Sequence, residues 1–222
     1  MSDPSDPPSA TKRVLSPAER RERNRAEMIA AILDAARAVM REEGVAALNL
    51  QRVAEGVGIR APSLYTYFPS KVAIYEALYV LGMRMYRERI ERVMGQEYGD
   101  VWEMFQAALN TYMEFAQENP ELYQLVFERP VPKFMPSEEG NEEARKLIEG
   151  SIGTLQRFVD AGEIVTGLPS DQASLLFVAI MHGLTSMHMA NEPDVPIRES
   201  RFGGLIPAAM TLLRAGWGTK GK

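Results

Sequence analysis

The chain has 222 residues, of which 45% are hydrophobic, and a formal net charge of −5, so it can bury one sizeable core or a small domain joined to a larger one. It contains no cysteine, which excludes disulfide frameworks, thiolate metal sites and cysteine nucleophiles. The first 20 residues lack the apolar core of a secretory signal, and the longest apolar run, residues 173–181, is far short of the roughly 20 residues that span a bilayer, so we expect a soluble, cytoplasmic protein without a membrane partner.

The N-terminal region combines a disordered composition with local positive charge. Residues 1–15 are rich in Pro, Ser and Asp, which predicts a disordered arm. Residues 1–75 carry 11 Lys or Arg and 9 Asp or Glu, a charge of +2, whereas residues 76–222 carry 14 and 21, a charge of −7. Six of the basic residues lie between Lys12 and Arg25. Because binding to phosphate depends on nearby charges, this front end could contact nucleic acid; it could equally be a solvated basic arm.

A long helix is predicted to follow Ser16. Ser16 and Glu19 have capping-box spacing, and Pro17 stands at the first helical position, where proline is favoured. Gly44 should end this helix as a left-handed cap. One apolar face repeats at helical spacing between these ends: Met28, Ile29, Ile32, Leu33, Ala36, Val39 and Met40.

Two short helices come next. Asn49 is a good N-cap for a helix over residues 50–57, and Gly58 closes it after two turns. Pro62 marks the start of a third helix, which should end at Phe68. Helices this short cannot each bury a large face, so their value must be geometric. A rigid, narrow helix with a polar edge fits the major groove of DNA, and we expect a helix-turn-helix at about residues 49–68.

The rest of the chain is also predicted to be helical. Ser70 should cap a fourth helix with an apolar stripe, and further helices are predicted at about 100–118, 120–128, 138–162, 170–190 and 199–215. The predicted fold is all-α. We expect a three-helix domain at 16–70 that contains the helix-turn-helix, and a larger helical effector-binding and dimerisation domain at 71–222.

The segment GVAALNLQRVAEGVGIRAPSLYTYFPSKVAIYEAL, from Gly44 to Leu78, resembles the TetR family of transcriptional repressors. It has the family's order of a glycine after the first helix, a polar cap, a short helix, a glycine turn and a recognition helix ending in Leu-Tyr-x-Tyr-Phe, followed by Ser-Lys. Asn49 replaces the family's frequent threonine, and Arg60 and Pro62 stand where Ser and Gly are common. These departures keep the backbone roles but alter operator preference.

The resemblance implies which residues contact double-stranded DNA. Small residues at the start of the recognition helix permit close approach to base edges, and tyrosine hydroxyls and Lys71 can bind phosphates. Tyr65 could instead be a packing tyrosine, and Arg52 a solvated surface arginine. The candidate contacts are Gln51, Arg52, Arg60, Ala61, Pro62, Ser63, Tyr65, Thr66, Tyr67 and Lys71.

The helices at about 170–190 and 199–215 carry too many apolar residues for lone surface helices. Two helices from each of two subunits would form a four-helix homodimer interface, which the resemblance also implies. Such a dimer would present its two recognition helices about one DNA turn, roughly 34 Å, apart to a near-palindromic operator. The alternative is a helix buried inside a monomer.

The middle helices are rich in aromatic residues and methionine, which are more often plain core than a ligand site. The family resemblance implies an effector pocket here, and methionine favours a small hydrophobic effector. This effector would bias a pendulum motion of the fourth helix and release DNA. The candidate ligand contacts are Met83, Tyr86, Trp102, Phe105, Tyr112, Phe127 and His182.

We expect no catalytic site, metal site or cofactor. His182 and His188, the only histidines, face about 240° apart on a helix and cannot chelate one metal. His182 could also be a structural core residue. The main functional prediction is therefore a repressor that a hydrophobic effector releases from its operator. The alternatives are a helical small-molecule-binding protein or enzyme without DNA binding, and an activator of the same fold.

Overall fold

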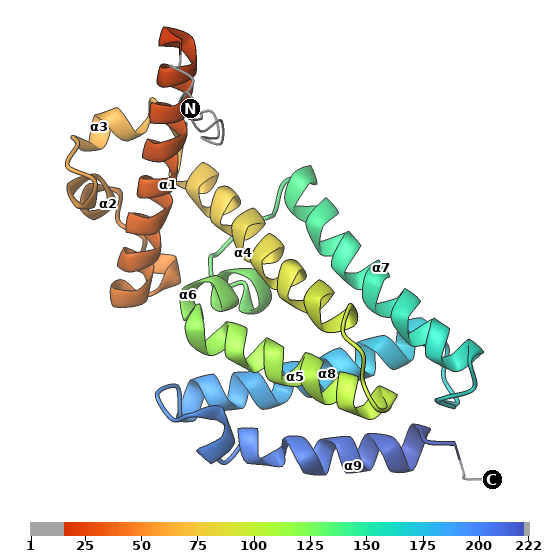
Figure 1. Cartoon of the computed structure of the whole chain (residues 1–222). Coiled ribbons are helices and arrows are strands. Elements are labelled where there is room, and N and C mark those ends of the chain that lie inside the picture. Colours follow the sequence, from red (N-terminus) through yellow and green to blue (C-terminus); the bar gives the residue numbers. More distant parts are fainter. Residues whose placement is uncertain (1–15, 220–222) are drawn as a thin grey trace, which may run out of the picture.

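The computed structural model describes residues 16–219, and their fold is helical (Figure 1). No strand forms within these residues, where one isolated bridge joins Ile164 to Gly218. The all-α prediction is confirmed. The expected disordered arm, residues 1–15, lies outside the described residues. The helices are α1 (Pro17–Glu43), α2 (Leu50–Gly56), α3 (Ala61–Leu64), α4 (Lys71–Met94), α5 (Val101–Glu118), α6 (Pro120–Tyr123), α7 (Glu138–Asp160), α8 (Ser170–Asn191) and α9 (Ile206–Trp217).

Local capping interactions define the small N-terminal group of helices α1–α3. The Ser16 hydroxyl accepts a hydrogen bond from the Glu19 amide, and the Glu19 carboxylate accepts one from the Ser16 amide, which completes the predicted capping box. Gly44 ends α1 at φ +92° and ψ 151°, a positive φ that favours glycine but not the left-handed helical cap that we predicted. Asn49 caps α2 by accepting from the amides of Gln51 and Arg52.

Helix α4 connects this group to the rest of the molecule (Figure 1). Its N-terminus is capped by Ser70, and the buried hydroxyl of Tyr75 donates to the carbonyl oxygen of Val45 at 2.7 Å. Ile74 and Leu78 are fully buried in the same core as α1. Because α4 also packs against α5 and α7, a domain boundary at residues 70/71 stays a prediction.

The larger group of helices surrounds α5. Helix α5 packs against α4, α8 and α9, while α7 lies along α4 and reaches α8 (Figure 1). Helix α4 approaches the segment after α6 very closely at Gly82. A Cβ atom there would lie 2.9 Å from a methyl carbon of Val126, so a larger residue would force the Val126 side chain or one of the two elements to shift.

Three predicted helices differ in detail from the structure. The recognition helix, expected to reach Phe68, is regular only to Leu64, and its continuation consists of tight turns in which Tyr65, Thr66 and Tyr67 bond to carbonyls three residues back. The helix expected at 120–128 becomes the π-helical turn η2 (Gln124–Glu128) after Tyr123.

The last helix begins at Ile206, not at 199. The preceding residues form the 3₁₀ turns η3 (Ile197–Glu199) and η4 (Gly203–Leu205). Two adjacent glycines disfavour an α-helix, and a Cβ atom on Gly203 would lie only 1.9 Å from the carbonyl oxygen of Ile197. Direct backbone packing at this corner therefore replaces the first two turns of the predicted helix.

Candidate DNA-binding surface and ligand cavity

Helix α3 and the turns after it present the outward edge that the sequence predicted. Leu64 and Phe68 are buried and fix this segment against α1 and α2. The positive φ of Gly58, +70°, makes the tight turn from α2 into α3. The predicted contact residues Pro62, Ser63, Tyr65 and Thr66 are exposed, with Tyr65 55% exposed, while Ala61 and Tyr67 are partly buried.

The remaining predicted contacts lie around this edge. Arg60 is exposed at the start of α3, and Lys71 lies half-buried at the first position of α4, 5.6 Å from the centre of the Tyr75 ring. Gln51 is exposed and hydrogen-bonds to Glu55 one turn later. These side chains remain accessible on the surface of the α2–α3 unit.

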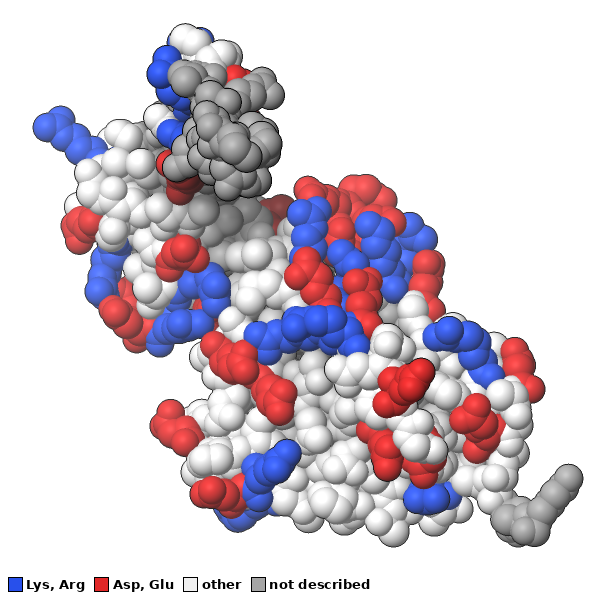
Figure 2. Space-filling view, in the orientation of Figure 1, with Lys and Arg blue, Asp and Glu red and all other residues white. Residues whose placement is uncertain are grey.

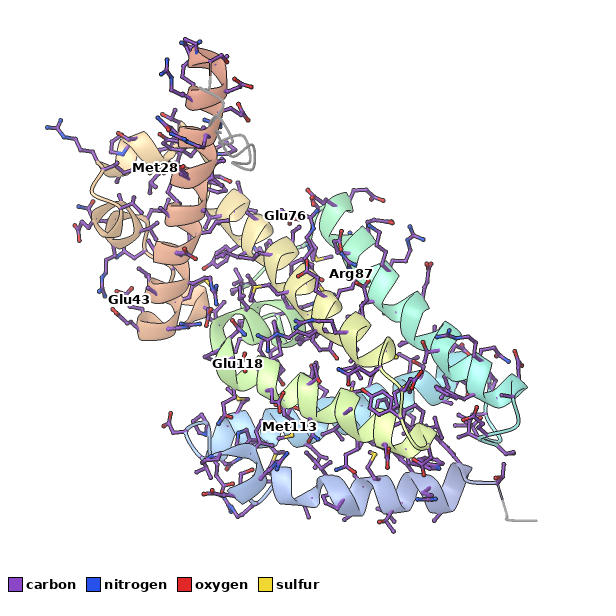
Figure 3. All side chains as sticks on the ribbon, in the orientation of Figure 1. Met28, Glu43, Glu76, Arg87, Met113 and Glu118 are labelled. Carbon is purple, nitrogen blue, oxygen red and sulfur yellow. The ribbon has the colours of Figure 1, made fainter. Side chains whose placement is uncertain are left out.

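Arg52 has partners that the sequence did not predict. Its guanidinium donates to Glu42 at 2.8 Å and to Glu43, both in the last turn of α1. These bonds raise the pKa of Arg52 above its ordinary value. Figure 3 shows Glu43 at this end of α1. Arg52 therefore connects α2 to α1, and contact with DNA would require it to leave two carboxylates.

Arg25 joins the edge although the sequence did not single it out as a contact. Its guanidinium donates to the carbonyl oxygen of Thr66 at 3.2 Å and lies 5.4 Å from the centre of the Tyr67 ring. The signal that could have identified it is its place in the basic stretch from Lys12 to Arg25. Figure 2 shows Lys and Arg side chains near the tip of α1 and beside the short helices.

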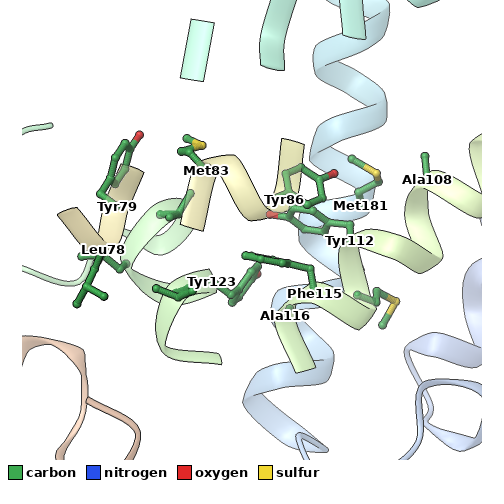
Figure 4. Close-up of a cluster of buried hydrophobic side chains, with 14 of the residues drawn as sticks. Leu78, Tyr79, Met83, Tyr86, Ala108, Tyr112, Phe115, Ala116, Tyr123 and Met181 are labelled. Atoms are coloured by element: carbon green, nitrogen blue, oxygen red, sulfur yellow. The ribbon is translucent and has the colours of Figure 1, made fainter. Parts of the chain in front are cut away.

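A cavity of about 720 Å³ lies in the larger group of helices, between α4, α5, η2, α7 and α8. Its wall is mainly apolar and aromatic, and several of its residues appear in Figure 4. Six of the seven predicted ligand contacts line it: Met83, Tyr86, Phe105, Tyr112, Phe127 and His182. Trp102, the seventh, is buried behind the wall and packs edge-on against Phe105 at 5.7 Å between ring centres. Trp102 therefore lies one layer of side chains farther from the cavity than the sequence predicted.

Polar side chains from three helices meet at His182 in the cavity wall, and the buried hydroxyls of Thr154 and Ser174 also line the cavity. The Tyr112 hydroxyl oxygen lies 3.0 Å from Nδ1 of His182, and the Tyr123 hydroxyl oxygen lies 3.4 Å from the same atom. Burial raises the pKa of both tyrosines above the ordinary value, so both are neutral phenols. The edge-on contacts of Tyr112 with Tyr86 and Phe127 keep its ring in place.

Charged side chains stand at the edge of the cavity between α4 and α7. Arg87 reaches from α4 toward α7 (Figure 3) and donates to Glu143 at 3.2 Å and to Glu91 at 2.6 Å. Burial would raise the pKa of Glu143, but hydrogen bonds from Lys146 and Arg87 hold it below its ordinary value. These ion pairs connect α4 to α7 across one rim.

A buried ion-pair cluster joins α1 to α6. The side chain of Glu121 is fully buried and accepts hydrogen bonds from Arg37 at 2.7 Å and from Arg41 at 2.5 Å. Arg37 also donates to the side-chain oxygen of Asn119 at 2.8 Å. The stretch from Glu121 to the end of η2 includes the cavity residues Val126 and Phe127. One short segment therefore touches both the cavity and α1.

Helices α8 and α9 have apolar side chains that are exposed on the surface of this chain. Leu176 is 42% exposed, and Ala179, Gly183 and Met187 continue the same exposed stripe at helical spacing. On α9, Leu212 is 74% exposed and Leu205 48%. By length and composition alone, α8 is the one helix among residues 16–219 that could cross a membrane. Its other face packs against α5 and α7, and Leu175 and Val178 are also exposed beside the stripe.

Two family models match the chain. Residues 32–78 match the model for bacterial regulatory proteins of the tetR family, and residues 105–201 match the model for a tetracyclin repressor-like C-terminal domain. The nucleoid occlusion factor SlmA of Glaesserella parasuis is 35% identical over 79 residues, which are 36% of this chain and 38% of that protein. The chain thus spans less than half the length of this curated relative.

Solved structures share the whole fold. A protein of unknown function from Rhodococcus sp. RHA1 superposes with a TM-score of 0.73 at 19% identity, over 86% of this chain and 96% of the other. The regulator FadR from Bacillus subtilis, solved in complex with stearoyl-CoA, has a TM-score of 0.64 at 19% identity, over 84% of this chain and 98% of FadR. At these identities the likeness concerns the fold.

Proposed function

Because this chain belongs to the tetR family of bacterial regulatory proteins, we propose that it is a dimeric, cytoplasmic DNA-binding repressor that a hydrophobic effector releases from a near-palindromic operator. The observation that carries the proposal is the exposed edge of α3 and its following turns, held rigidly by buried Leu64 and Phe68. The match of residues 32–78 to the family model supports a role for this edge in DNA recognition.

In this proposal the edge residues divide into two kinds of contact. Ser63, exposed on the first turn of α3, reads base edges in the major groove. Tyr65 and Lys71 bind phosphates on either side, and Arg25 holds the Thr66 carbonyl and the Tyr67 ring so that the edge keeps its shape. Arg52 is a structural residue here, since it is bonded to Glu42 and Glu43.

A second copy of the chain covers the exposed stripes on α8 and α9. Small residues at Ala179 and Gly183 allow close helix packing, and Leu212 supplies apolar area. The resulting twofold symmetry would place two α3 edges about one DNA turn, roughly 34 Å, apart.

The effector occupies the cavity of about 720 Å³. Its methionine and aromatic wall suits an apolar molecule, and this volume lies within the roughly 300–1,000 Å³ of typical ligand pockets. The stearoyl-CoA bound by FadR, a protein of the same fold, makes acyl-CoA compounds the first effectors to test.

The effector signal passes to the DNA-binding helices along two neighbouring elements. An effector that displaces Phe127 and Val126 moves η2, and with it Glu121, which holds Arg37 and Arg41 of α1. Close packing of Gly82 on Val126 moves α4 at the same time. A coupling energy of about 1–3 kcal/mol would lower DNA affinity roughly five- to 150-fold.

Selection of bound DNA from a random pool supplies the operator for the test. Wild-type protein and a Tyr65→Ala, Lys71→Ala double variant are then compared in a gel-shift assay on that DNA. We expect the double variant to lose most binding, because both phosphate contacts are gone. Lys133→Ala, which removes an exposed lysine from the loop before α7, is the control and should bind normally. Unchanged binding by the double variant, or failure to select any DNA, would favour a small-molecule-binding protein or enzyme without DNA binding.

A further inference from the structure

The polar group in the cavity has an unused hydrogen-bonding atom. Tyr112 of α5 and His182 of α8 line the cavity, whose wall is mainly apolar, and the hydroxyls of Tyr112 and of the fully buried Tyr123 of α6 both approach Nδ1 of His182. No hydrogen bond to Nε2 of His182 is found among residues 16–219. His182 lines the cavity and is partly exposed to it. The free ring nitrogen is thus available to whatever fills the cavity.

The hydrogen bond between Tyr112 and His182 is linked to which ring nitrogen carries the proton. Both hydroxyls are neutral, since burial raises their pKa values, and each has one proton to donate. The 3.0 Å contact between the Tyr112 hydroxyl and Nδ1 fits two arrangements, in which either the hydroxyl or Nδ1 is the donor. When the hydroxyl donates, the ring proton is on Nε2, which is then a hydrogen-bond donor; when Nδ1 donates, Nε2 is an acceptor.

We infer that the Tyr112 hydroxyl donates to Nδ1, and that Nε2 of His182 therefore donates to an uncharged acceptor, such as the carbonyl oxygen of a ketone, ester or thioester, on an otherwise apolar effector. This inference rests on the proposed role of the cavity as the effector site. A carbonyl oxygen matches the N–H donor of His182, and the aromatic wall contacts the apolar remainder. Tyr112 is the positioning residue, because its hydrogen bond sets the tautomer and orients the ring.

A carboxylate is the competing class of ligand. Arg87 and Lys146 at the rim are bonded to Glu143, whereas Arg129 and Arg157 also line the cavity and are not part of these ion pairs. The groups that contact His182 itself are neutral phenols, so we assign the uncharged acceptor to this part of the wall, and a carboxylate probe tests the alternative.

The test uses three nine-carbon probes: nonane, 2-nonanone and nonanoate. Their dissociation constants are measured by displacement of anilinonaphthalene sulfonate from wild-type protein, His182→Phe, His182→Gln and Tyr112→Phe. Each variant is scored by its ratio of ketone to alkane affinity, so differences in the hydration of the probes cancel. Helical circular dichroism and retained nonane binding show that a variant is folded.

We expect His182→Phe to lower this ratio about tenfold, the value of one buried hydrogen bond of roughly 1.4 kcal/mol. His182→Gln keeps an N–H donor and should restore most of the ratio, while Tyr112→Phe should lower it in part. A ratio that His182→Phe leaves unchanged, nonanoate binding tighter than 2-nonanone, or no binding of any probe would overturn the inference. Loss of DNA binding in the Tyr65→Ala, Lys71→Ala variant is independent of these results, so the proposed function and the effector chemistry fail separately.

Discussion

At the scale of single residues, DNA affinity and DNA sequence preference should depend on different side chains of the same edge. Ser63 is exposed on the first turn of α3, where a small polar side chain can reach base edges. Lys71 is at the N-terminus of α4, where its charge and the free backbone amides both favour phosphate. Base contacts carry sequence information, whereas phosphate contacts act on every sequence.

Ser63→Ala should therefore change operator preference at one base pair of each half-site by about 1–3 kcal/mol and leave non-specific affinity unchanged. Lys71→Ala should weaken binding to all sequences, and the slope of log K against log salt concentration should become shallower by about one, because one phosphate is no longer neutralised. Titration of both variants against the operator and a panel of single-base changes, at several salt concentrations, checks the division. A uniform loss of affinity for Ser63→Ala would contradict it.

At the same scale, the burial of His188 leads to a prediction about how the stability of the fold depends on pH. Its side chain is fully buried on α8, both ring nitrogens lack a partner among the described residues, and burial lowers its pKa below the ordinary value. In the unfolded chain the imidazole gains a proton near a pH of about 6.5, whereas in the folded protein it gains a proton only at a lower pH. The unfolded state thus binds more protons, and acid destabilises the fold.

The free energy of unfolding of the wild type should fall as pH decreases below about 6.5, by up to about 1.4 kcal/mol per pH unit. His188→Leu removes both unpartnered nitrogens and should flatten this dependence, with equal or greater stability at neutral pH. Urea unfolding of the wild type and the variant, over a series of mildly acidic to neutral buffers, measures the stability of each at neutral pH and its dependence on pH. Equal slopes for the two proteins would show that His188 does not cause the acid sensitivity.

At the scale of elements, the segment from α6 through η2 connects the cavity to α1. Its buried Glu121 holds Arg37 and Arg41, and Phe127 in η2 lines the cavity. This arrangement adds a second route beside the pendulum motion of α4 that the sequence suggested. The short segment would transmit even a small displacement, because its buried contacts are closely packed and leave little free space.

Glu121→Gln should leave effector binding nearly unchanged but reduce the effector-induced loss of DNA affinity, since the charged contacts to α1 are weakened. Glu118→Gln, which changes an exposed carboxylate bonded to Arg89 just before α6, is the matched control. Operator binding with and without a bound effector gives the coupling factor for each protein. An unchanged factor in Glu121→Gln would exclude this route.

Elements were predicted well where local signals are strong. The capping box at Ser16, the Asn49 cap and the Ser70 cap all lie where the sequence places them, because each satisfies free amides of its own helix. The start of α9 and the π-helical turn were not predicted, because close packing outside each helix accompanies them, which helical spacing does not encode. Gly203 packs on the backbone of Ile197, and the segment at Val126 packs against Gly82.

The site shows the same division between local and long-range causes. The outward edge of α3 follows from helical spacing, so it could be predicted. The carboxylate partners of Arg52 and the layer behind Phe105 that holds Trp102 depend on tertiary packing, which spacing does not encode. The cavity was expected from the family resemblance, since the composition of the middle helices is more often that of plain core, and neither predicted the shared contacts of Tyr112 and Tyr123 with His182.

At the scale of the whole molecule, dimerisation joins the exposed stripes of α8 and α9 to operator recognition. Leu212→Arg places a charge in the most exposed part of the α9 stripe and should produce a monomer, because an unpaired charge would be buried at the interface. Val165→Arg, also on an exposed apolar residue but outside both helices, is the matched control and should remain dimeric. Light scattering after size-exclusion chromatography gives the mass. A Leu212→Arg dimer would refute this interface.

The most direct test of the account is a hydroxyl-radical footprint of the wild-type protein on its selected operator. Two recognition edges in one symmetric dimer predict two protected half-sites of inverted sequence, centred about one helical turn, roughly 34 Å, apart. Both protections should disappear together in the Tyr65→Ala, Lys71→Ala variant. A single protected patch without inverted symmetry, or protection that survives in this variant, would contradict the claim that a dimer reads DNA through α3.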